Sequence, residues 1–228
     1  MLKFKIKLFL SYSIDDQMLA KKLKNKLQYY PLIDVFMAPD DIGYGILWDE
    51  EIKYRIKNCD AVIALITKNF HSAKWTEQEM GLAWAFEKKI IGLTTDNTLA
   101  KGYVERFQIN PIREEMYDNI MDDLVFKIYP EIEDKADFVE HLINHLLPKS
   151  SSYYESNCIG RMLRLFVKNL TLDQSTKIIE PFFRNGQVTN AGVWRTLCKD
   201  VITKPNSFLT LDEESKTKLR NYFANEQS

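Results

Sequence analysis

One glutamate lies where an amphipathic helix would place apolar side chains. The stretch SAKWTEQEMGLAWAF, residues 72–86, has apolar residues at helical spacing, and Glu79 falls within their stripe. Helix geometry alone favours a surface position, in which Glu79 extends past its neighbours to solvent or to Lys74. The alternative is a cleft in which Trp75 partly desolvates the carboxylate, raising its pKa and making it a candidate functional group. The apolar members of the stripe are Trp75, Leu82, Ala83 and Phe86.

Strand and helix patterns alternate around this segment. Apolar residues alternate over 2–10, and the run 61–67 is continuously apolar, as in a central parallel strand that is covered on both faces. The segments IDVFM and IIGLTT predict two more strands, and helical stripes occupy 20–27 and 48–56. Because strands and helices alternate, the pattern predicts an α/β fold with a doubly wound parallel sheet and right-handed crossovers.

Several residues should meet Glu79 at the carboxyl edge of this sheet, where open α/β sheets bind ligands. Tyr12 and Ser13 end the first strand, and Ser13 could cap the next helix together with Asp16. Trp48 directly follows the loop DDIGYGIL, so its ring could stack on a nucleobase or on nicotinamide. Trp48 also begins a helical stripe, which fits a core position equally well.

After residue 95 the pattern weakens. DDLVFKIYP is compatible with a last edge strand or with the end of a helix, and Phe138, Leu142 and Leu146 predict a closing helix. The segment LPKSSSYY resembles a linker, so we expect one domain over 1–148 and a small helical domain of unknown role over 149–228. Thr210 and Glu213 suggest a capping box for its last helix. The expected core of the helical domain consists of Phe182, Phe183, Trp194 and Phe208.

Composition and missing motifs exclude several functions. The chain has 31 basic and 32 acidic residues, so no global field would draw it to nucleic acid or to anionic lipid. It has no apolar span of about 18 residues, and its three cysteines form no CxxC pair, which favours a cytoplasmic protein without a membrane segment.

The GYG sequence lacks the context of a dinucleotide fingerprint, and no P-loop is present. His141 and His145 share a helix face without a third ligand, so we expect no metal.

Three segments resemble, in order and spacing, the sequence boxes of TIR (Toll/interleukin-1 receptor) domains. They are KLFLSYSIDD, the stretch IDVFMAPDDIGYGILWDEEIKYRIKNCDAVIALIT, and FHSAKWTEQEMGLAWA. The first resembles the F-x-S-Y box, the second the BB loop with its helix and strand, and the third the S-x-W-x-x-x-E box. The resemblance covers about residues 4–147 and implies a flavodoxin-like fold.

The resemblance also implies site residues. In enzymatic TIR domains the glutamate of the third box is the catalytic residue of NAD cleavage. The resemblance places Glu79 at that position. NAD is then the substrate and no further cofactor is implied. This sequence has Thr76 where many enzymatic members have cysteine, and Ser13 where some have arginine. The substrate-binding residues implied in the same way are Tyr12, Ser13, Asp41, Trp48, Ser72 and Trp75.

Two functions remain open on this sequence. One is a bacterial-type enzyme, similar to the Thoeris antiphage TIR proteins, that releases nicotinamide and either ADP-ribose or a cyclic signal. Such an enzyme would self-associate through its TIR domains and could signal to an effector protein. The other is a non-catalytic TIR scaffold that acts by homotypic assembly. Trp48, Trp75 and Glu79 favour the enzyme, because an adaptor has no physical need for a carboxylate between aromatic rings.

Overall fold

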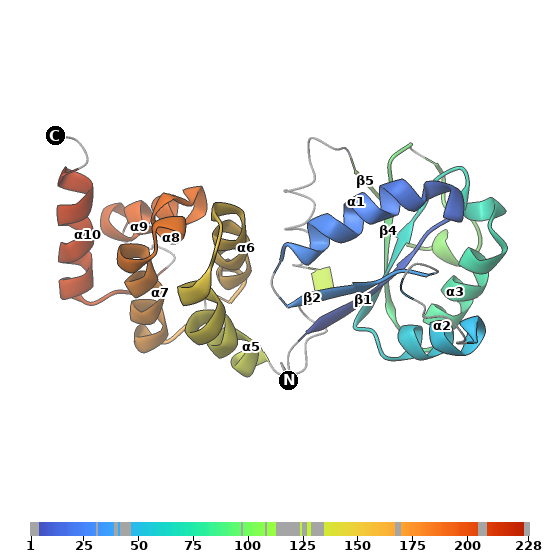
Figure 1. Cartoon of the computed structure of the whole chain (residues 1–228), viewed down its shortest axis with the longest axis horizontal. Coiled ribbons are helices and arrows are strands. Elements are labelled where there is room, and N and C mark those ends of the chain that lie inside the picture. Colours follow the sequence, from blue (N-terminus) through green and yellow to red (C-terminus); the bar gives the residue numbers. More distant parts are fainter. Residues whose placement is uncertain are drawn as a thin grey trace. The chain divides into compact units, whose positions relative to one another are not determined.

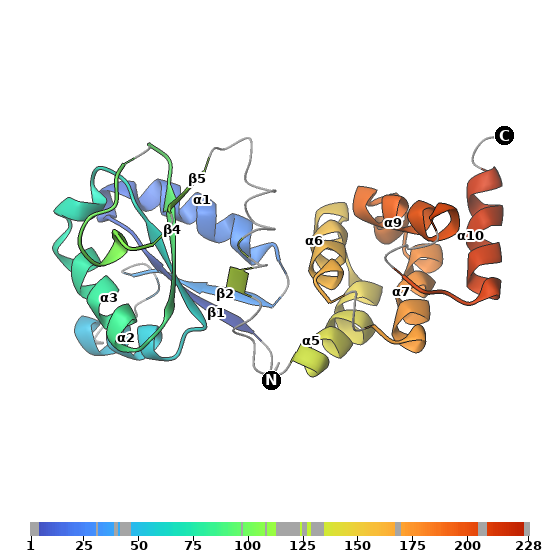
Figure 2. The same ribbon diagram turned by 180° about the vertical axis from the view of Figure 1, so that it is seen from behind.

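The computed structural model describes residues 5–30, 32–38, 41, 47–96, 98–107, 109–112, 124, 127–128, 135–166, 170–204 and 209–225. The chain divides into two compact units. The first comprises residues 1–28 and 32–133, and the second comprises 29–31 and 134–228. Figure 1 and Figure 2 show the sheet of the first unit and the helices of the second from opposite sides.

The first unit contains a five-stranded parallel sheet with the order β2-β1-β3-β4-β5. Its strands are β1 (Ile6–Ser11), β2 (Ile33–Phe36), β3 (Ala61–Leu65), β4 (Lys89–Thr94) and β5 (Ile109–Pro111). Every residue of β3 is buried, as the unbroken apolar run predicts for a central strand. This strand order is that of flavodoxin-like sheets, so the predicted fold class is confirmed.

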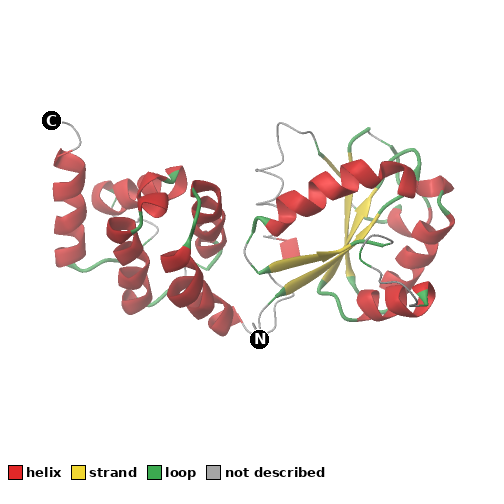
Figure 3. Ribbon diagram, viewed as in Figure 1, coloured by secondary structure: helices red, strands yellow, loops and turns green. Residues whose placement is uncertain are grey.

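Helices cover both faces of this sheet. Helix α1 (Gln17–Gln28) lies on one face, and α2 (Trp48–Lys57) and α3 (Lys74–Ala85) lie on the other (Figure 3). Short 3-10 turns, η1 (Ile14–Asp16), η2 (Phe70–Ser72) and η3 (Gly102–Val104), follow three of the strands. The core between the sheet and α2 and α3 includes Phe9, Phe36, Ile52, Ile56, Val62, Met80 and Ala83. The layers therefore hold the carboxyl ends of β1, β3 and β4 next to the first turns of the helices.

The edge strand β5 is not the one that the sequence suggested. It lies at Ile109–Pro111, and its three residues are too few to show a periodic pattern. Within DDLVFKIYP, the described residues Leu124, Lys127 and Ile128 are helical, and Leu124 and Ile128 are buried. These residues therefore agree with the prediction that this segment belongs to a helix, and not with the prediction of an edge strand.

Within its described residues, the regular secondary structure of the second unit consists of helices joined by short turns. Its turns and helices pack around Trp194, which is fully buried and whose Nε1 donates a hydrogen bond to the Ser156 carbonyl oxygen at 2.7 Å. Phe182 is buried as predicted, whereas Phe183 is 39% exposed and so is not a core residue; Phe208 lies outside the described residues. The elements are α5 (Lys135–His141), η6 (Leu142–Leu146), η7 (Leu147–Lys149), α6 (Tyr153–Arg164), α7 (Leu172–Arg184), α8 (Gly186–Asn190), α9 (Gly192–Thr203) and α10 (Glu213–Asn225).

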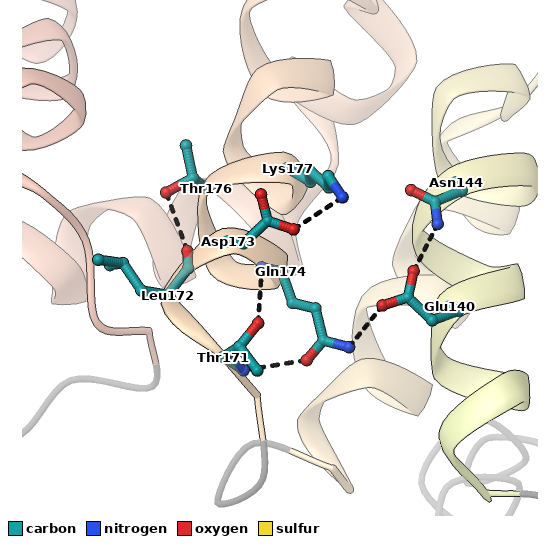
Figure 4. A network of polar contacts seen from close by, with 8 residues as sticks. All are labelled: Glu140, Asn144, Thr171, Leu172, Asp173, Gln174, Thr176 and Lys177. Carbon is teal, nitrogen blue, oxygen red and sulfur yellow. Dashed lines mark hydrogen bonds and ion pairs between the residues drawn. The ribbon is translucent and has the colours of Figure 1, made fainter.

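The two units divide earlier in the chain than residue 148. Helix α5 and the turn η6 together carry the predicted closing stripe, and the Phe138 ring of α5 lies 5.6 Å from the ring of Phe166. Figure 4 shows a polar contact of α5 with α7, in which Gln174 Nε2 of α7 donates a hydrogen bond to Glu140 Oε1 at 2.7 Å. The segment 135–148, expected in the first domain, therefore packs with the later helices, because its apolar stripe faces them.

Two predicted helix caps differ in detail from the structure. Helix α10 begins at Glu213, and Asp212 caps it by accepting a hydrogen bond from the Ser215 backbone N–H at 2.7 Å. The capping box of Thr210 with Glu213 is therefore wrong, because the helix starts two residues later than that box requires. At η1 the Ser13 side chain makes no capping hydrogen bond. Instead, the backbone carbonyl oxygen of Ser13 accepts a hydrogen bond from the backbone N–H of Asp16.

No helix within the described residues is both long and apolar enough to cross a membrane.

Candidate functional site

Glu79 lies on the buried face of α3 and only 6% of it is exposed. The buried residues of this helix, Thr76, Glu79, Met80 and Ala83, follow the i, i+3, i+4, i+7 pattern. Trp75 is 48% exposed, because it precedes Thr76 by one residue and so lies about 100° round the helix. The surface interpretation of Glu79 is therefore wrong, and so is the placement of Trp75 in the buried stripe.

The Glu79 carboxylate contacts the last residue of β1. Ser11 Oγ donates a hydrogen bond to Glu79 Oε2 at 2.5 Å. Because successive side chains alternate along a strand, Ser11 faces the same side of the sheet as Phe9, which belongs to the core under α2 and α3. Burial raises the pKa of Glu79 to about 7, and the hydrogen bond from Ser11 partly opposes that rise.

Side-chain hydrogen bonds tie together the loops that follow β1, β3 and β4. Asp16 of η1 accepts from Thr67 Oγ1 at 2.5 Å and from Asn69 Nδ2 at 3.0 Å, both in the segment after β3. Asp96, after β4, accepts from the Lys68 backbone N–H at 3.0 Å. These bonds fix the carboxyl edge of the sheet at three neighbouring strands, so the surroundings of Glu79 are built on a rigid frame.

The start of α3 is fixed separately. Thr76 shares its one hydroxyl proton between two carbonyl oxygens, that of Phe70 at 2.6 Å and that of Ala73 at 2.8 Å. This threonine is buried and satisfies carbonyl groups of η2 and of the helix cap. Its role in this structure is therefore to hold the turn that carries Ser72 against the helix that carries Glu79.

The other predicted site residues, apart from Asp41, lie on elements that reach the carboxyl edge of the sheet. Tyr12 and Ser13 are buried directly after β1. Trp48, the first residue of α2, is 45% exposed, so it does not belong to the core that Ile52 and Ile56 enter. Ser72, at the end of η2, is exposed. Trp48 and Trp75 thus both leave aromatic surface open to a ligand.

Asp41 has a different environment from the other predicted residues. Its carboxylate accepts from the Lys24 ammonium, with both oxygens at 2.6 Å, and from the Met37 backbone N–H at 2.7 Å. These contacts tie the position after β2 to α1, and they do not involve Glu79 or Ser11. The other loop residues between 39 and 46 lie outside the described part of the chain.

A cavity of about 250 Å³ lies beside β2, but Glu79 does not line it. Its walls include Lys24, Phe36, Asp41 and Arg55. The Arg55 guanidinium lies 4.6 Å from the centre of the Phe36 ring and its Nε pairs with Glu51, so its charge is already engaged. The Glu79 carboxylate and this cavity are therefore separate features of the first unit.

The described residues contain no group of three or more His, Cys, Asp or Glu side chains that could hold a metal ion. The rings of His141 and His145 lie 4.9 Å apart. The two rings are tilted relative to each other by 37°. Burial and the nearby His145 lower the pKa of His141.

Sequence reasoning did not single out Ser11 or Thr67, and it named Asp16 only as the partner of Ser13 in a helix cap. The strand alternation that places Phe9 in the core also places Ser11 on that face, which is the signal that could have identified it. Asp16 and Thr67 are 51 residues apart, so their contact depends on the register of β1 and β3.

A sequence model of the TIR domain matches residues 8–121. A search among curated proteins finds no match to the chain. The match spans β1 to the region after β5 and contains Ser11, Trp48 and Glu79.

Proposed function

Because this chain belongs to the TIR domain family, we propose that it cleaves the bond between nicotinamide and ribose in NAD, with Glu79 as the catalytic carboxylate. The observation that carries the proposal is a buried glutamate at the carboxyl edge of the sheet, hydrogen-bonded to Ser11 and beside no described cation that would pair with it. A carboxylate in such a position destabilises the fold when it is ionised, so a functional role explains its presence better than a structural one.

One carboxylate is sufficient for this reaction. Nicotinamide carries a positive charge in NAD and leaves as a neutral molecule, so its departure needs no general acid, unlike the leaving group of an ordinary glycosidase. Positive charge develops on the ribose in the oxocarbenium-like transition state. An ionised Glu79 stabilises that charge strongly, because the buried site has a low dielectric constant.

The exposed tryptophans supply flat surfaces for the substrate. Trp48 and Trp75 would stack against the nicotinamide ring, since both present aromatic surface at the start of a helix near this edge. Tyr12, Ser13 and Ser72 would flank the ribose and the phosphates. Asp41 would act indirectly in this scheme, because its ion pair with Lys24 anchors the position after β2 to α1.

The acceptor of the ribosyl group decides the product. Water would give ADP-ribose, whereas an adenine nitrogen or a ribose hydroxyl of the same molecule would give a cyclic product. Either could serve as a signal in bacterial antiphage defence, read by an effector protein. The second, helical unit carries no motif that names such a partner.

A scaffold that acts by homotypic assembly is the competing function. Trp84 on α3 is 52% exposed even though the Arg106 guanidinium lies 5.7 Å from its ring. The exposed part of this ring offers apolar surface for self-association. Such a scaffold makes no use of a buried, hydrogen-bonded carboxylate, so the arrangement of Ser11 and Glu79 favours the enzyme.

The test is to incubate the full chain with NAD and to resolve nicotinamide, ADP-ribose and cyclic products by chromatography, with and without a crowding agent that promotes assembly. We expect nicotinamide release by the wild type and by Glu105→Gln, which alters an exposed carboxylate of the same unit. Glu79→Gln should release at least about a hundredfold less, the usual cost of losing a major electrostatic group. Equal release by wild type and Glu79→Gln would remove Glu79 from the mechanism, and absence of release under both conditions would favour the scaffold.

A further inference from the structure

The described residues contain one hydrogen-bond partner for Glu79, and that partner is Ser11. The Ser11 Oγ to Glu79 Oε2 distance of 2.5 Å is that of a strong, charge-assisted bond between a hydroxyl and a carboxylate. Only 1% of Ser11 is exposed. Water therefore does not compete for its hydroxyl, and the bond joins two residues that are 68 positions apart in the chain.

Ser11 lies on one of the most constrained elements of the fold. Strand β1 pairs with β2 on one side and β3 on the other, and Ser11 itself is in register with Ala64. A glutamate has three side-chain torsions, and burial alone does not select one rotamer among those that the site admits. A donor fixed on an interior strand narrows the choice to those orientations of Glu79 that meet it.

The bond leaves one carboxylate oxygen for a ligand. Glu79 Oε1 has no partner among the described residues, and it is not one of their fully buried unpaired polar atoms either. Oε1 is therefore not completely enclosed, whereas Oε2 is held by the strand.

We propose that Ser11 is the positioning residue of this site: its hydroxyl holds Glu79 Oε2, so that Oε1 faces the ribose. The proposal deepens the proposed NAD cleavage and rests on it for the identity of the ligand. The orientation of the carboxylate is a property of the protein alone and can be measured without NAD.

The same hydroxyl favours the ionised form of Glu79. Among the described residues, burial and the Ser11 bond are the two influences on the Glu79 pKa. The neighbouring acids on packed elements are engaged elsewhere: Glu77 lies 3.3 Å from the His71 ring, and Asp16 accepts from Thr67. Removal of the Ser11 hydroxyl therefore leaves burial unopposed, and the pKa of Glu79 should rise.

The experiment compares the wild type with Ser11→Ala, which deletes the hydroxyl, and Ser11→Thr, which keeps it. The Glu79 carboxyl carbon is titrated by ¹³C NMR in the full chain without NAD, and its signal is assigned by its absence from Glu79→Gln. We expect Ser11→Ala to raise the midpoint by about one pH unit, the usual effect of losing a hydrogen bond to a charged group, and Ser11→Thr to restore it. Circular dichroism checks that each variant is folded.

Turnover supplies the second readout. In Ser11→Ala we expect kcat for nicotinamide release at pH 7 to fall by about tenfold or more, with little change in KM for NAD, because the carboxylate is misplaced and less ionised while the binding surfaces persist. An unchanged Glu79 midpoint, or wild-type kcat in a folded Ser11→Ala, would overturn the role of Ser11. If the midpoint moves as expected but the wild type releases no nicotinamide, Ser11 still positions the carboxylate and only the proposed reaction fails.

Discussion

Replacing Glu79 by glutamine should stabilise the fold at alkaline pH and have little such effect at acidic pH. In the folded chain burial raises the pKa of Glu79 from 4.5 to about 7, so the folded state binds this proton more tightly than the unfolded state does. Stability therefore falls as the pH rises from about 4.5 to about 7, and the loss is complete above that range. Glutamine does not titrate, and its amide oxygen can still accept the hydrogen bond from Ser11.

The size of the effect follows from the two pKa values. At about 1.4 kcal/mol for each pH unit between 4.5 and about 7, the ionised carboxylate lowers the free energy of unfolding by about 3 kcal/mol at full ionisation. Part of that loss is already present at pH 5. The stability gained by Glu79→Gln should accordingly be larger at pH 8 than at pH 5 by about 2.5 kcal/mol. Because only 6% of Glu79 is exposed, solvent screening reduces this value little.

Urea unfolding of the full chain, followed by circular dichroism at pH 5 and pH 8, measures the difference. Glu105→Gln is the matched control, since its carboxylate is exposed and its substitution should change stability equally at both pH values. Other titrating groups are common to the variants and cancel in the comparison. A gain for Glu79→Gln that is the same at pH 5 and pH 8 would refute the reasoning, because it would mean that Glu79 titrates alike in the folded and unfolded chain.

Three further predictions test separate parts of the structure. Trp48→Ala should raise KM for NAD several-fold without lowering the midpoint of thermal unfolding, because this side chain is exposed; a lower midpoint with unchanged KM would make it structural. Asp212→Ala should cost about 1 kcal/mol in urea unfolding through loss of the α10 cap, whereas Thr210→Ala should cost less; the reverse order would restore the capping box. Gly102→Ala should cost about 1–3 kcal/mol in the same assay, because φ is +63° and the new Cβ would lie 2.7 Å from Glu77 Oε2; an unchanged midpoint would contradict that strain.

The sequence predicts the layers of the first unit well, because each layer has a local signature. The unbroken run over 61–67 gives a strand buried on both faces, and the spacing of Ile52 and Ile56 gives the buried stripe of α2. Other features depend on tertiary packing. The stripe of Phe138 and Leu142 shows that a helix has an apolar face but not which unit covers it, so the division at 133/134 could not be obtained from periodicity.

The candidate site shows the same division between local and distant information. The spacing places Glu79 within an apolar stripe of α3. It does not fix the rotation of the helix about its axis to within one residue, which is about 100°. In the structure the buried face therefore contains Thr76 in place of the predicted Trp75. The bond between Ser11 and Glu79 spans 68 positions, so it follows from the sheet register and not from any local pattern. The family resemblance implies a catalytic role for Glu79, and the structure adds the Ser11 hydroxyl that contacts it.

The most direct test of the central claim is the pH dependence of kcat/KM for nicotinamide release from NAD by the wild-type chain. If the ionised Glu79 carboxylate stabilises the transition state, kcat/KM should rise about tenfold per pH unit below a midpoint near 7 and reach a plateau above it. The residual activity of Glu79→Gln should lack that step. A wild-type profile that stays flat between pH 5 and pH 9, or the same midpoint in Glu79→Gln, would contradict the account.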